Sequence, residues 1–306
     1  MEKEEHTMEI RRWHAIGIAL LAVGLVLAWA AAGQAGMKVG FSVSTQVNPF
    51  YKAMADGVRD QATAEGYEVT ILNADDKLEK QIADVEDLIQ KKIDVLIINA
   101  TQDGAAAVLN KAADAGIPVI TLQRAVPGAK VVSHIGTDNV VIGREGAEWI
   151  AKKLNGKGNV VVMEGIPGAA SSEDRKKGSA EVWPKYPGIK IVAQQSGKYD
   201  RAVALGVMEN ILQAQPQIDA VFCFNDEMAM GALAAVKAAK RTGIAITGMD
   251  ANKDAREAVE KGELAMTIAL PPYDIGKTGV IFAKWLQTKE KPVPALQVMP
   301  VSFITK

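Results

Sequence analysis

The fold is decided by a stretch near the start of the chain, Gly40-Phe41-Ser42-Val43-Ser44-Thr45-Gln46-Val47-Asn48-Pro49-Phe50-Tyr51. Residues 39–43 predict a short buried strand, and Pro49 fixes φ at a value that suits the start of a helix. Apolar residues then recur one helical turn apart, at Met54, Val58 and Ala62. The stretch therefore predicts a strand that passes into a helix through a polar turn.

That turn has two interpretations. Ligands bind at the carboxyl edge of an open parallel sheet, which favours a binding role for Ser44 and Asn48. Two adjacent rings, Phe50 and Tyr51, are unusual in a chain with 5% aromatic residues. The alternative is an ordinary Asn-Pro turn whose rings belong to the core, and this stretch alone leaves both interpretations open.

The composition is that of a soluble globular protein. The 306 residues, 48% hydrophobic and 23% charged, suffice for two lobes of ordinary size. The net charge is −1, and the first 35 residues hold three basic and four acidic residues, so the rest is formally neutral. Such a balance gives no basic surface for nucleic acid or an anionic membrane, and we expect no nucleic-acid partner.

The first 35 residues predict an export signal. Arg11-Arg12 precedes an apolar run over residues 15–32, and Gly33-Gln34-Ala35 places small residues where a signal peptidase reads the chain. We expect cleavage after Ala35 and a fold that begins at residue 37. The run is slightly long for a signal core, so an uncleaved anchor is the alternative.

Cysteine and histidine are too scarce for several kinds of site. The only cysteine, Cys223, lies in the apolar segment 220–224, where we expect it to pack in the core without a disulfide. His134 is the only histidine beyond the leader. A histidine-based metal site or a Ser-His-Asp triad therefore lacks its parts, and we expect no metal and no cofactor.

The remaining chain alternates strands and helices. Residues 95–98 form a continuous apolar run, as in a strand buried on both faces. Strands are expected at 39–43, 69–72, 95–98, 119–122, 131–136, 159–163, 189–195, 220–224, 244–247 and 266–270. In the second half, helices are expected to begin near Ser172, Arg201, Glu227, Asn252 and Pro272. This pattern predicts an α/β fold of two doubly wound parallel-sheet lobes.

The two series of elements have similar lengths, which predicts two lobes of similar plan. We expect a first lobe of residues 37–137 plus 271–298 and a second lobe of residues 138–270 plus 299–306. No stretch between them is rich in Gly, Ser or Pro, so structured crossings rather than a flexible linker should join them. Three crossings are expected, near Thr137, near Leu270 and near Val298-Met299.

Polar residues follow most of the expected strands, and a parallel sheet gathers them at one edge. The residues that follow the expected strands are Ser44, Asn73, Asn99, Gln123-Arg124, Glu164, Gly197, Asn225-Asp226, Met249-Asp250 and Leu270, and all but Gly197, Met249 and Leu270 are polar. Each has a structural alternative: Asn225, Asp226 or Asp250 can cap a helix, and Arg175 can be a solvated surface residue. Their joint appearance at one edge of both lobes favours a ligand site.

Several of these motifs together resemble the ribose-binding type of periplasmic sugar-binding proteins, in order and spacing, from residue 37 almost to the end. They are Ser44-Thr45-x-x-Asn48-Pro49-Phe50-Tyr51, Ile98-Asn99-Ala100-Thr101, Gly116-Ile117-Pro118-Val119 to Arg124, Val132-Ser133-His134-Ile135, Tyr199-Asp200-Arg201 and Asn225-Asp226-Glu227-Met228-Ala229-x-Gly231-Ala232. Members of that family close two lobes on one sugar and hand it to the permease of an ATP-driven (ABC) transporter. The resemblance implies a periplasmic location and the same role here.

The resemblance also implies the ligand-binding residues. They are Ser44, Asn48, Phe50, Tyr51, Asn99, Gln123 and Arg124 in the first lobe, and Arg175, Tyr199, Asn225, Met249, Asp250 and Leu270 in the second. Three positions depart from the ribose pattern. Gln123 stands where ribose binders have an acid, Met249 where they have an aromatic ring and Leu270 where they have an amide.

The residue types in this set suit a neutral sugar or sugar alcohol. Rings can cover the C–H faces of a sugar, while amides, guanidinium groups and a carboxylate bind its hydroxyl groups. Two arginines near Asp250 leave a sugar acid as an alternative. Because Leu270 offers no partner to a hydroxyl group, we expect that ribose is not the best ligand. Contacts split between lobes predict that the ligand stabilises a closed hinge.

Three rival functions remain. An enzyme on the same fold lacks the phosphate-binding patterns G-x-G-x-x-G and G-x-x-x-x-G-K-[ST], and Gly165-Ile166-Pro167-Gly168 is too short to replace them. A gene regulator of the lac-repressor class would need a helix-turn-helix where the export signal stands. A sensory partner of a chemoreceptor or membrane kinase is compatible with the sequence.

Overall fold

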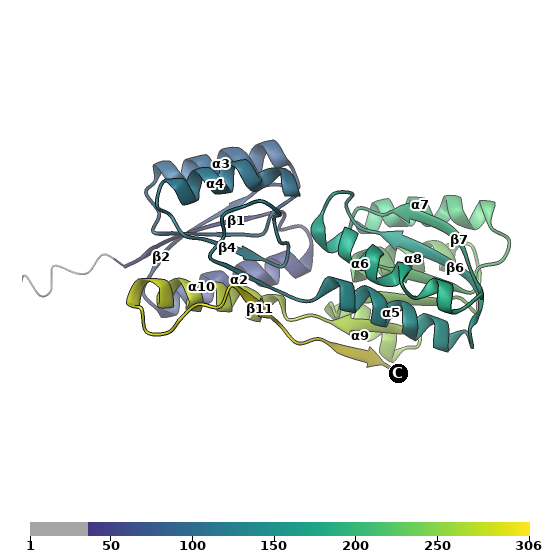
Figure 1. Cartoon of the computed structure of the whole chain (residues 1–306). Coiled ribbons are helices and arrows are strands. Elements are labelled where there is room, and N and C mark those ends of the chain that lie inside the picture. The colour runs from purple at the N-terminus through teal and green to yellow at the C-terminus, as the bar shows by residue number, and fades with distance from the viewer. Residues whose placement is uncertain (1–35) are drawn as a thin grey trace, which may run out of the picture. The chain divides into compact units, whose positions relative to one another are not determined.

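A computed structural model describes residues 36–306, and the predicted export signal lies outside these residues. Two six-stranded sheets, each with helices on both sides, form the part from Lys38 to Lys306 (Figure 1). We call each sheet with its helices a lobe. The predicted fold class is thereby confirmed.

The first sheet has the order β11-β5-β4-β3-β1-β2, and all its neighbouring strands are parallel. Its strands are β1 (Lys38–Val43), β2 (Glu68–Asn73), β3 (Val95–Ile98), β4 (Val119–Leu122), β5 (Ser133–Gly136) and β11 (Leu296–Val298). Every residue of β3 and β4 is buried, in agreement with their continuous apolar runs. Both strands have the predicted bounds.

Helices cover both faces of the first sheet. On one side α2 (Pro49–Ala64) packs on α10 (Pro272–Thr288), and on the other lie α3 (Leu78–Gln90), the short helix η1 (Asp103–Ala105) and α4 (Ala106–Asp114) (Figure 1). The contact between α2 and α10 is close because Gly57 and Gly276 lie in it, where a Cβ atom would overlap the backbone of the other helix. A helix late in the sequence thus belongs to the first lobe.

The second sheet has the order β12-β10-β9-β8-β6-β7, and it is parallel except for the pair of β10 and β12. Its strands are β6 (Lys157–Glu164), β7 (Gly188–Ser196), β8 (Ala220–Cys223), β9 (Ala245–Asp250), β10 (Met266–Ala269) and β12 (Ser302–Thr305). Cys223 is fully buried in β8. Its place in the core agrees with the expectation from the sequence.

The helices of the second lobe also pack in groups. Helix α5 packs on α6 and α7 packs on α8, while α9 contacts the sheet at β10 and β12. Their bounds are α5 (Asn139–Lys153), α6 (Ala170–Ala180), η2 (Trp183–Lys185), α7 (Arg201–Ala214), α8 (Asp226–Ala238) and α9 (Lys253–Glu260). Among residues 36–306, no helix combines the length and the apolar character needed to cross a membrane.

The chain passes between the two sheets three times: from β5 to α5, from β10 to α10 and from β11 to β12. The strands β11 and β12, on either side of the third passage, were not predicted because both are short and largely exposed. Three strand ends also need correction. Asn73 and Glu164 are the last residues of β2 and β6 and do not follow them. Met249 and Asp250 belong to β9, because β9 continues to pair with β10 up to Asp250.

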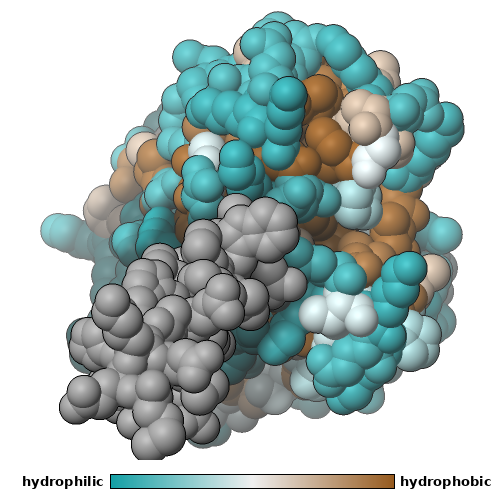
Figure 2. Space-filling model, turned by 90° about the vertical axis from the view of Figure 1, so that its left-hand side faces the viewer, coloured by the Kyte–Doolittle hydropathy of each residue, from teal (hydrophilic) through white to brown (hydrophobic). Residues whose placement is uncertain are grey.

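The outer end of the first lobe, away from the second lobe, is mostly hydrophilic, with hydrophobic side chains visible between the polar ones (Figure 2). The carboxyl ends of the strands lie at the other end of this lobe, toward the second lobe (Figure 1). The edges that carry the predicted ligand residues therefore face each other.

Candidate ligand-binding site

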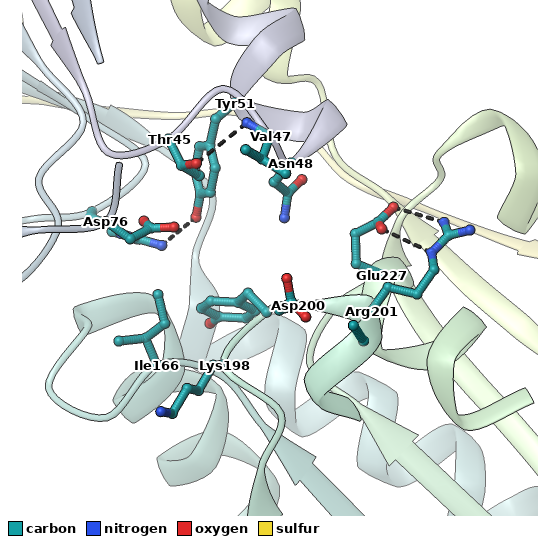
Figure 3. A pocket seen from close by; sticks show the side chains of 13 residues that line it. Thr45, Val47, Asn48, Tyr51, Asp76, Ile166, Lys198, Asp200, Arg201 and Glu227 are labelled. Atoms are coloured by element: carbon teal, nitrogen blue, oxygen red, sulfur yellow. Dashed lines mark hydrogen bonds and ion pairs between the residues drawn. The ribbon is translucent and has the colours of Figure 1, made fainter. Parts of the chain in front are cut away.

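Two adjoining pockets lie where these edges meet. The outer pocket has a volume of about 230 Å³ and is lined by Thr45, Val47, Asn48, Tyr51, Asp76, Arg124, Ile166, Lys198, Tyr199, Asp200, Arg201, Ala202 and Glu227 (Figure 3). The inner pocket measures about 10 Å³ and is lined by Asn48, Phe50, Tyr51, Gln123, Ser171, Arg175, Tyr199, Asn225 and Asp250. A space of that size holds roughly one water molecule.

In the first lobe, the start of α2 positions one amide and two rings. The Asn48 side-chain oxygen accepts a hydrogen bond from the backbone N–H of Phe50 at 2.9 Å and so caps the helix. The rings of Phe50 and Tyr51 meet edge to face, with centroids 5.2 Å apart. Asn48 therefore combines the two roles that the sequence left open, because it is a cap that also lines both pockets.

Arg124 is the largest fully buried side chain of the described residues, with 1% of its surface exposed. Its guanidinium donates to the carbonyl oxygens of Ala100 and Thr101, at 2.9 and 3.2 Å, and to the Tyr51 hydroxyl at 2.6 Å. Its Nε has no hydrogen-bond partner among the described residues. Burial raises the pKa of Tyr51 to about 12 despite the opposing charge of Arg124, so the phenol stays protonated.

Arg175, in α6, is the corresponding buried cation of the second lobe. Its Nε donates to the Asn139 side-chain oxygen at 3.0 Å, and its Nη1 donates to the carbonyl oxygen of Phe224. These partners hold the guanidinium at the inner pocket, where 3% of the residue is exposed. Arg175 is therefore not the solvated surface residue that the alternative interpretation required.

Tyr199 lies between the two arginines. Its ring centroid is 5.8 Å from the guanidinium carbon of Arg124 and 5.9 Å from that of Arg175. Its hydroxyl is 3.1 Å from the hydroxyl of Ser171. The ring lines both pockets and provides an aromatic surface that a C–H face of a ligand can contact.

Asn225 and Asp250 complete the inner pocket from the second sheet. Asn225 caps α8, because its side-chain oxygen accepts from the backbone N–H of Met228 at 2.9 Å. Asp250 ends β9 with 8% of its surface exposed, and it caps no helix. Burial, reinforced by the charge of Asp226, raises the pKa of Asp250 well above its ordinary value, while Arg175 opposes the shift.

Gln123 lines the inner pocket, but its amide is already engaged. It donates to the Thr137 hydroxyl at 2.9 Å and accepts from the Thr137 backbone N–H at 3.3 Å. Thr137 belongs to the first passage between the sheets, and Asn139, the partner of Arg175, donates to its carbonyl oxygen at 3.4 Å. Hydrogen bonds thus connect Gln123 to Arg175 through the hinge.

The structure brings nine of the thirteen predicted residues to the pockets, and four line neither. Ser44 donates to the Asn99 side-chain oxygen at 2.7 Å, and Asn99 donates to the carbonyl oxygen of Leu122 at 2.9 Å, so both are used inside the first lobe. Met249 and Leu270 are buried and line neither pocket. A ligand role for the thirteen residues stays a prediction.

The sequence did not single out several residues that line the pockets. Ser171 reaches the inner pocket from α6. The outer pocket adds Thr45, Val47, Asp76, Ile166, Lys198, Asp200, Arg201, Ala202 and Glu227. Thr45, Asp200 and Arg201 stand in motifs that were noted for their neighbours, and Asp76 lies shortly after β2, so proximity to a strand end was the available signal.

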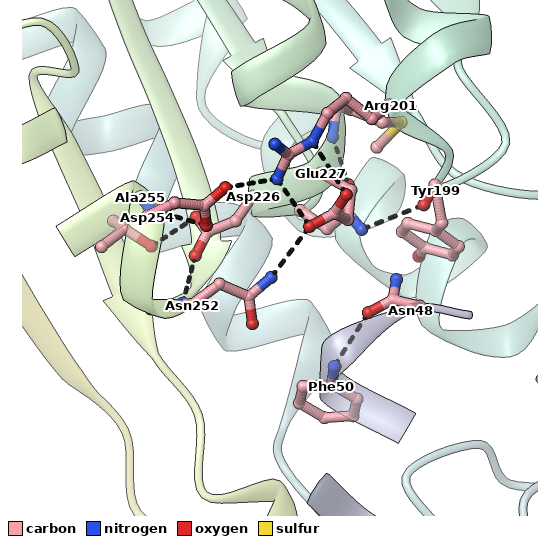
Figure 4. Close-up of polar contacts among 12 residues, drawn as sticks. Asn48, Phe50, Tyr199, Arg201, Asp226, Glu227, Asn252, Asp254 and Ala255 are labelled. Atoms are coloured by element: carbon pink, nitrogen blue, oxygen red, sulfur yellow. Dashed lines mark hydrogen bonds and ion pairs between the residues drawn. The ribbon is translucent and has the colours of Figure 1, made fainter. Parts of the chain in front are cut away.

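The outer pocket carries both signs of charge. Arg201 pairs with Glu227 at 2.9 Å and with Asp254 at 2.5 Å (Figure 4). Burial raises the pKa of Asp76, whereas the charge of Arg124 lowers it. Within residues 36–306, no three His, Cys, Asp or Glu side chains lie together as metal ligands would.

Comparison with known proteins identifies the family. The family model described as "Periplasmic binding protein domain" matches residues 39–291. The ribose import binding protein of Bacillus subtilis is 39% identical over 254 residues, covering 81% of this chain and 82% of its own. A Bacillus halodurans ABC transporter solute-binding protein with bound myo-inositol has a TM-score of 0.84 at 29% identity, covering 89% of this chain and 96% of its own.

A sensory protein is also among the similar structures. The fructose-binding periplasmic domain of a hybrid two-component system has a TM-score of 0.84 at 30% identity and covers 88% of this chain and 91% of its own. The fold therefore serves both transport and sensing. The extent of the family match shows that this chain belongs to the periplasmic binding protein family, whose members bind substrates.

Proposed function

We propose that this protein captures one monosaccharide or sugar alcohol between its lobes and delivers it to the permease of an ABC transporter. The observation that carries this proposal is the cleft itself, where rings and hydrogen-bonding side chains from both lobes face one space. Sugars present C–H faces and hydroxyl groups, which such a combination binds. The named ligands of the relatives, ribose and myo-inositol, are neutral polyols and support the same ligand class.

Closure of the hinge is the proposed mechanism. The inner pocket has a volume of about 10 Å³, so no sugar enters it unless the lobes or side chains move. A ligand that contacts both lobes favours the closed form, because only that form satisfies both sets of contacts. Small-angle scattering should show compaction with a bound sugar, and binding without compaction would contradict the mechanism.

We further propose that ribose is not the preferred ligand. The Gln123 amide is held by two hydrogen bonds to Thr137 and carries no charge, and Leu270 is apolar and lies buried outside both pockets, so Leu270 offers no partner to a sugar hydroxyl and Gln123 offers only a neutral one. An unpaired buried hydroxyl costs about 1 to 3 kcal/mol. Calorimetric titration that finds submicromolar ribose binding, tighter than that of deoxysugars and polyols, would contradict this proposal.

Export and lobe boundaries complete the proposal. A signal peptide cleaved after Ala35 would place the mature chain in the periplasm, which suits the family description. We propose lobe boundaries after residues 137, 270 and 298, and the three passages of the chain between the sheets support this division. Amino-terminal sequencing of the exported protein tests the cleavage site.

A thermal-shift screen against pentoses, hexoses, deoxysugars, pentitols, tetritols and inositols tests the main proposal. A ligand at a thousand times its Kd stabilises the folded form by about 4 kcal/mol, which raises the Tm measurably. A large shift with one polyol would support the ligand class. No shift with any of them would overturn it.

A sensory role is the second candidate, favoured by the similarity to the fructose-binding domain of a two-component system. Deletion of the gene for this protein alone distinguishes the roles: loss of sugar uptake supports transport, whereas unchanged uptake with a lost transcriptional or chemotactic response supports sensing. We propose no enzymatic activity. Recovery of the bound sugar chemically unchanged, by mass spectrometry, is the expected result.

A further inference from the structure

The turn that carries Asp250 has an unfavourable backbone conformation. Asp250 has φ of 118° and Ala251 has φ of 56°, values at which side chains other than glycine's are strained. Such residues cost on the order of 1 to 3 kcal/mol each and persist only where the surroundings hold them. Something next to this turn must therefore stabilise it.

Asp226 is the group that holds the turn. One oxygen of its carboxylate accepts from the backbone N–H of Asn252 at 2.7 Å, as Figure 4 shows, and the other accepts from the Thr267 hydroxyl at 2.6 Å. The Thr267 oxygen in turn accepts from the backbone N–H of Ala251 at 3.3 Å. Both amides that follow Asp250 are thus bound, one directly and one through Thr267.

The packing around Asp226 leaves no alternative use for its carboxylate. The residue is fully buried and lines neither pocket. Its carboxylate lies against the backbone of β9, at Gly248, where a Cβ atom would overlap it. The contact requires glycine at position 248 for space, and it places Asp226 directly behind the strand that ends in Asp250.

The charges around Asp226 are mostly acidic. Asp250, Asp254 and Glu227 face it, while Arg201 is paired with the last two. The positive charge of Arg175 acts to lower the pKa of Asp250. Burial raises the pKa of Asp226 to about 7, against the hydrogen bonds from Thr267 and Asn252.

We propose that Asp226 is a positioning residue, which holds the turn 250–252 so that the Asp250 carboxylate points into the inner pocket, and thereby sets ligand affinity without touching the ligand. The inference rests on the proposed function, because it assumes that Asp250 binds a sugar hydroxyl. The proposal gives a binding-related role to Asp226, which would otherwise be only an acidic residue that interacts favourably with the helix dipole at the start of α8.

Paired variants test the proposal by calorimetric titration with D-ribose, D-fructose and myo-inositol. Asp226→Asn keeps the shape but loses one acceptor and the charge, and we expect a Kd at least tenfold higher for whichever probe binds. Thr267→Val removes the hydroxyl that links Asp226 to Ala251 and should raise Kd several-fold. Thr267→Ser keeps this hydroxyl, and its Kd should stay within twofold of wild type.

Asp219→Asn is the matched control. Asp219 accepts from the backbone N–H of Asn159 at 2.6 Å and immediately precedes β8, at the opposite end of the same sheet. The variant should lower the Tm without a change in Kd beyond twofold. Equal Kd changes in Asp219→Asn and Asp226→Asn would reduce the role of Asp226 to general stability and overturn the proposal.

The pH profile separates positioning from a merely structural role. Affinity should rise as Asp250 ionises, and in Asp226→Asn that rise should move to lower pH, because the neighbouring negative charge is gone. A Kd within twofold of wild type with an unmoved profile would overturn the proposal.

A crystal structure of Asp226→Asn without sugar decides the positioning step by itself. We expect Ala251 to leave its positive φ and the Asp250 side chain to leave the inner pocket. An unchanged turn overturns the proposal even if sugars bind. Absence of binding by the wild type to all three probes bears instead on the proposed function, so the two failures are distinguishable.

Discussion

The carboxyl edges of the two sheets both hold a buried arginine but differ in their buried acids. At the first edge the N–H groups of Arg124 donate to two carbonyl oxygens and to the Tyr51 hydroxyl. At the second edge Arg175 is accompanied by two buried acids, Asp226 and Asp250, and both acids have raised pKa values.

The difference teaches how each lobe fixes its ligand residues. The first lobe uses neutral hydrogen bonds among Ser44, Asn99 and backbone carbonyls to hold its edge. The second lobe buries a carboxylate behind a strained turn to aim another one. One buried group in each lobe has a shifted pKa, raised for Asp226 and lowered for His134, so we expect the two lobes to respond to pH in opposite directions.

The largest expected effect is the loss of stability with rising pH that Asp226 causes. The pKa of Asp226 is about 7 in the folded protein against an ordinary value of 3.8, so folding favours the protonated form. The resulting contribution to the free energy of unfolding is fully present below about pH 4 and is lost as pH rises through 7. The shift corresponds to about 4 kcal/mol at most. Urea unfolding of wild type and Asp226→Asn between pH 4 and 8 should show a flatter profile for the variant.

His134 should give the opposite dependence in the first lobe. Its Nδ1 lies 2.9 Å from the Thr121 hydroxyl, and burial lowers its pKa from 6.5 to about 4. Its contribution is present above pH 6.5 and is lost as pH falls through 4, up to about 3 kcal/mol. His134→Gln should remove this loss in acid unfolding experiments, and an unchanged acid limb would contradict the assignment.

A smaller effect is expected when the buried cation of either edge is removed. Hydrogen bonds to charged groups contribute about 1.5 to 3 kcal/mol, so Arg124→Met and Arg175→Met should each weaken sugar binding by roughly 10- to 100-fold. Calorimetric titration with the sugar found in the thermal screen measures this loss.

Arg59→Met is the control for both variants. Arg59 lies on α2 and pairs at the surface with Asp56, so its loss should leave affinity within twofold of wild type. If Arg175→Met binds as tightly as wild type while Arg124→Met does not, Arg175 makes no contact with the sugar, and its assignment as a ligand-binding residue is wrong.

Much of the fold was predictable because its signals are local. The continuous apolar runs of β3 and β4 gave correct bounds, since strands buried on both faces need no alternation. The strands β11 and β12 escaped prediction because they are short and exposed, and only their pairing with distant strands defines them. The end of β9 was placed too early because its last residues, although buried, are defined as strand by their pairing with β10.

The sequence predicted the location of the site better than it predicted the contacts within it. Strand ends and motifs located Asn48, Arg124 and Asp250 at the cleft. They could not reveal that the Asn99 side chain hydrogen-bonds to Ser44 and to the carbonyl oxygen of Leu122, because hydrogen-bond partners far apart in sequence leave no local pattern. Ser171 was missed for a related reason, since a small polar residue early in a helix is common.

The smallest effect concerns Ser171 and Tyr199, the hydroxyl pair of the second edge. Tyr199→Phe and Ser171→Ala each remove one side of the 3.1 Å contact, and a neutral hydrogen bond contributes about 1 kcal/mol, so each should change sugar affinity by about fivefold or less. The double variant should lose no more than the larger single loss, because both changes break the same bond. Additive losses in this cycle would mean that each hydroxyl contacts the sugar separately, and the second edge would then present two more ligand groups than its hydrogen bonding implies.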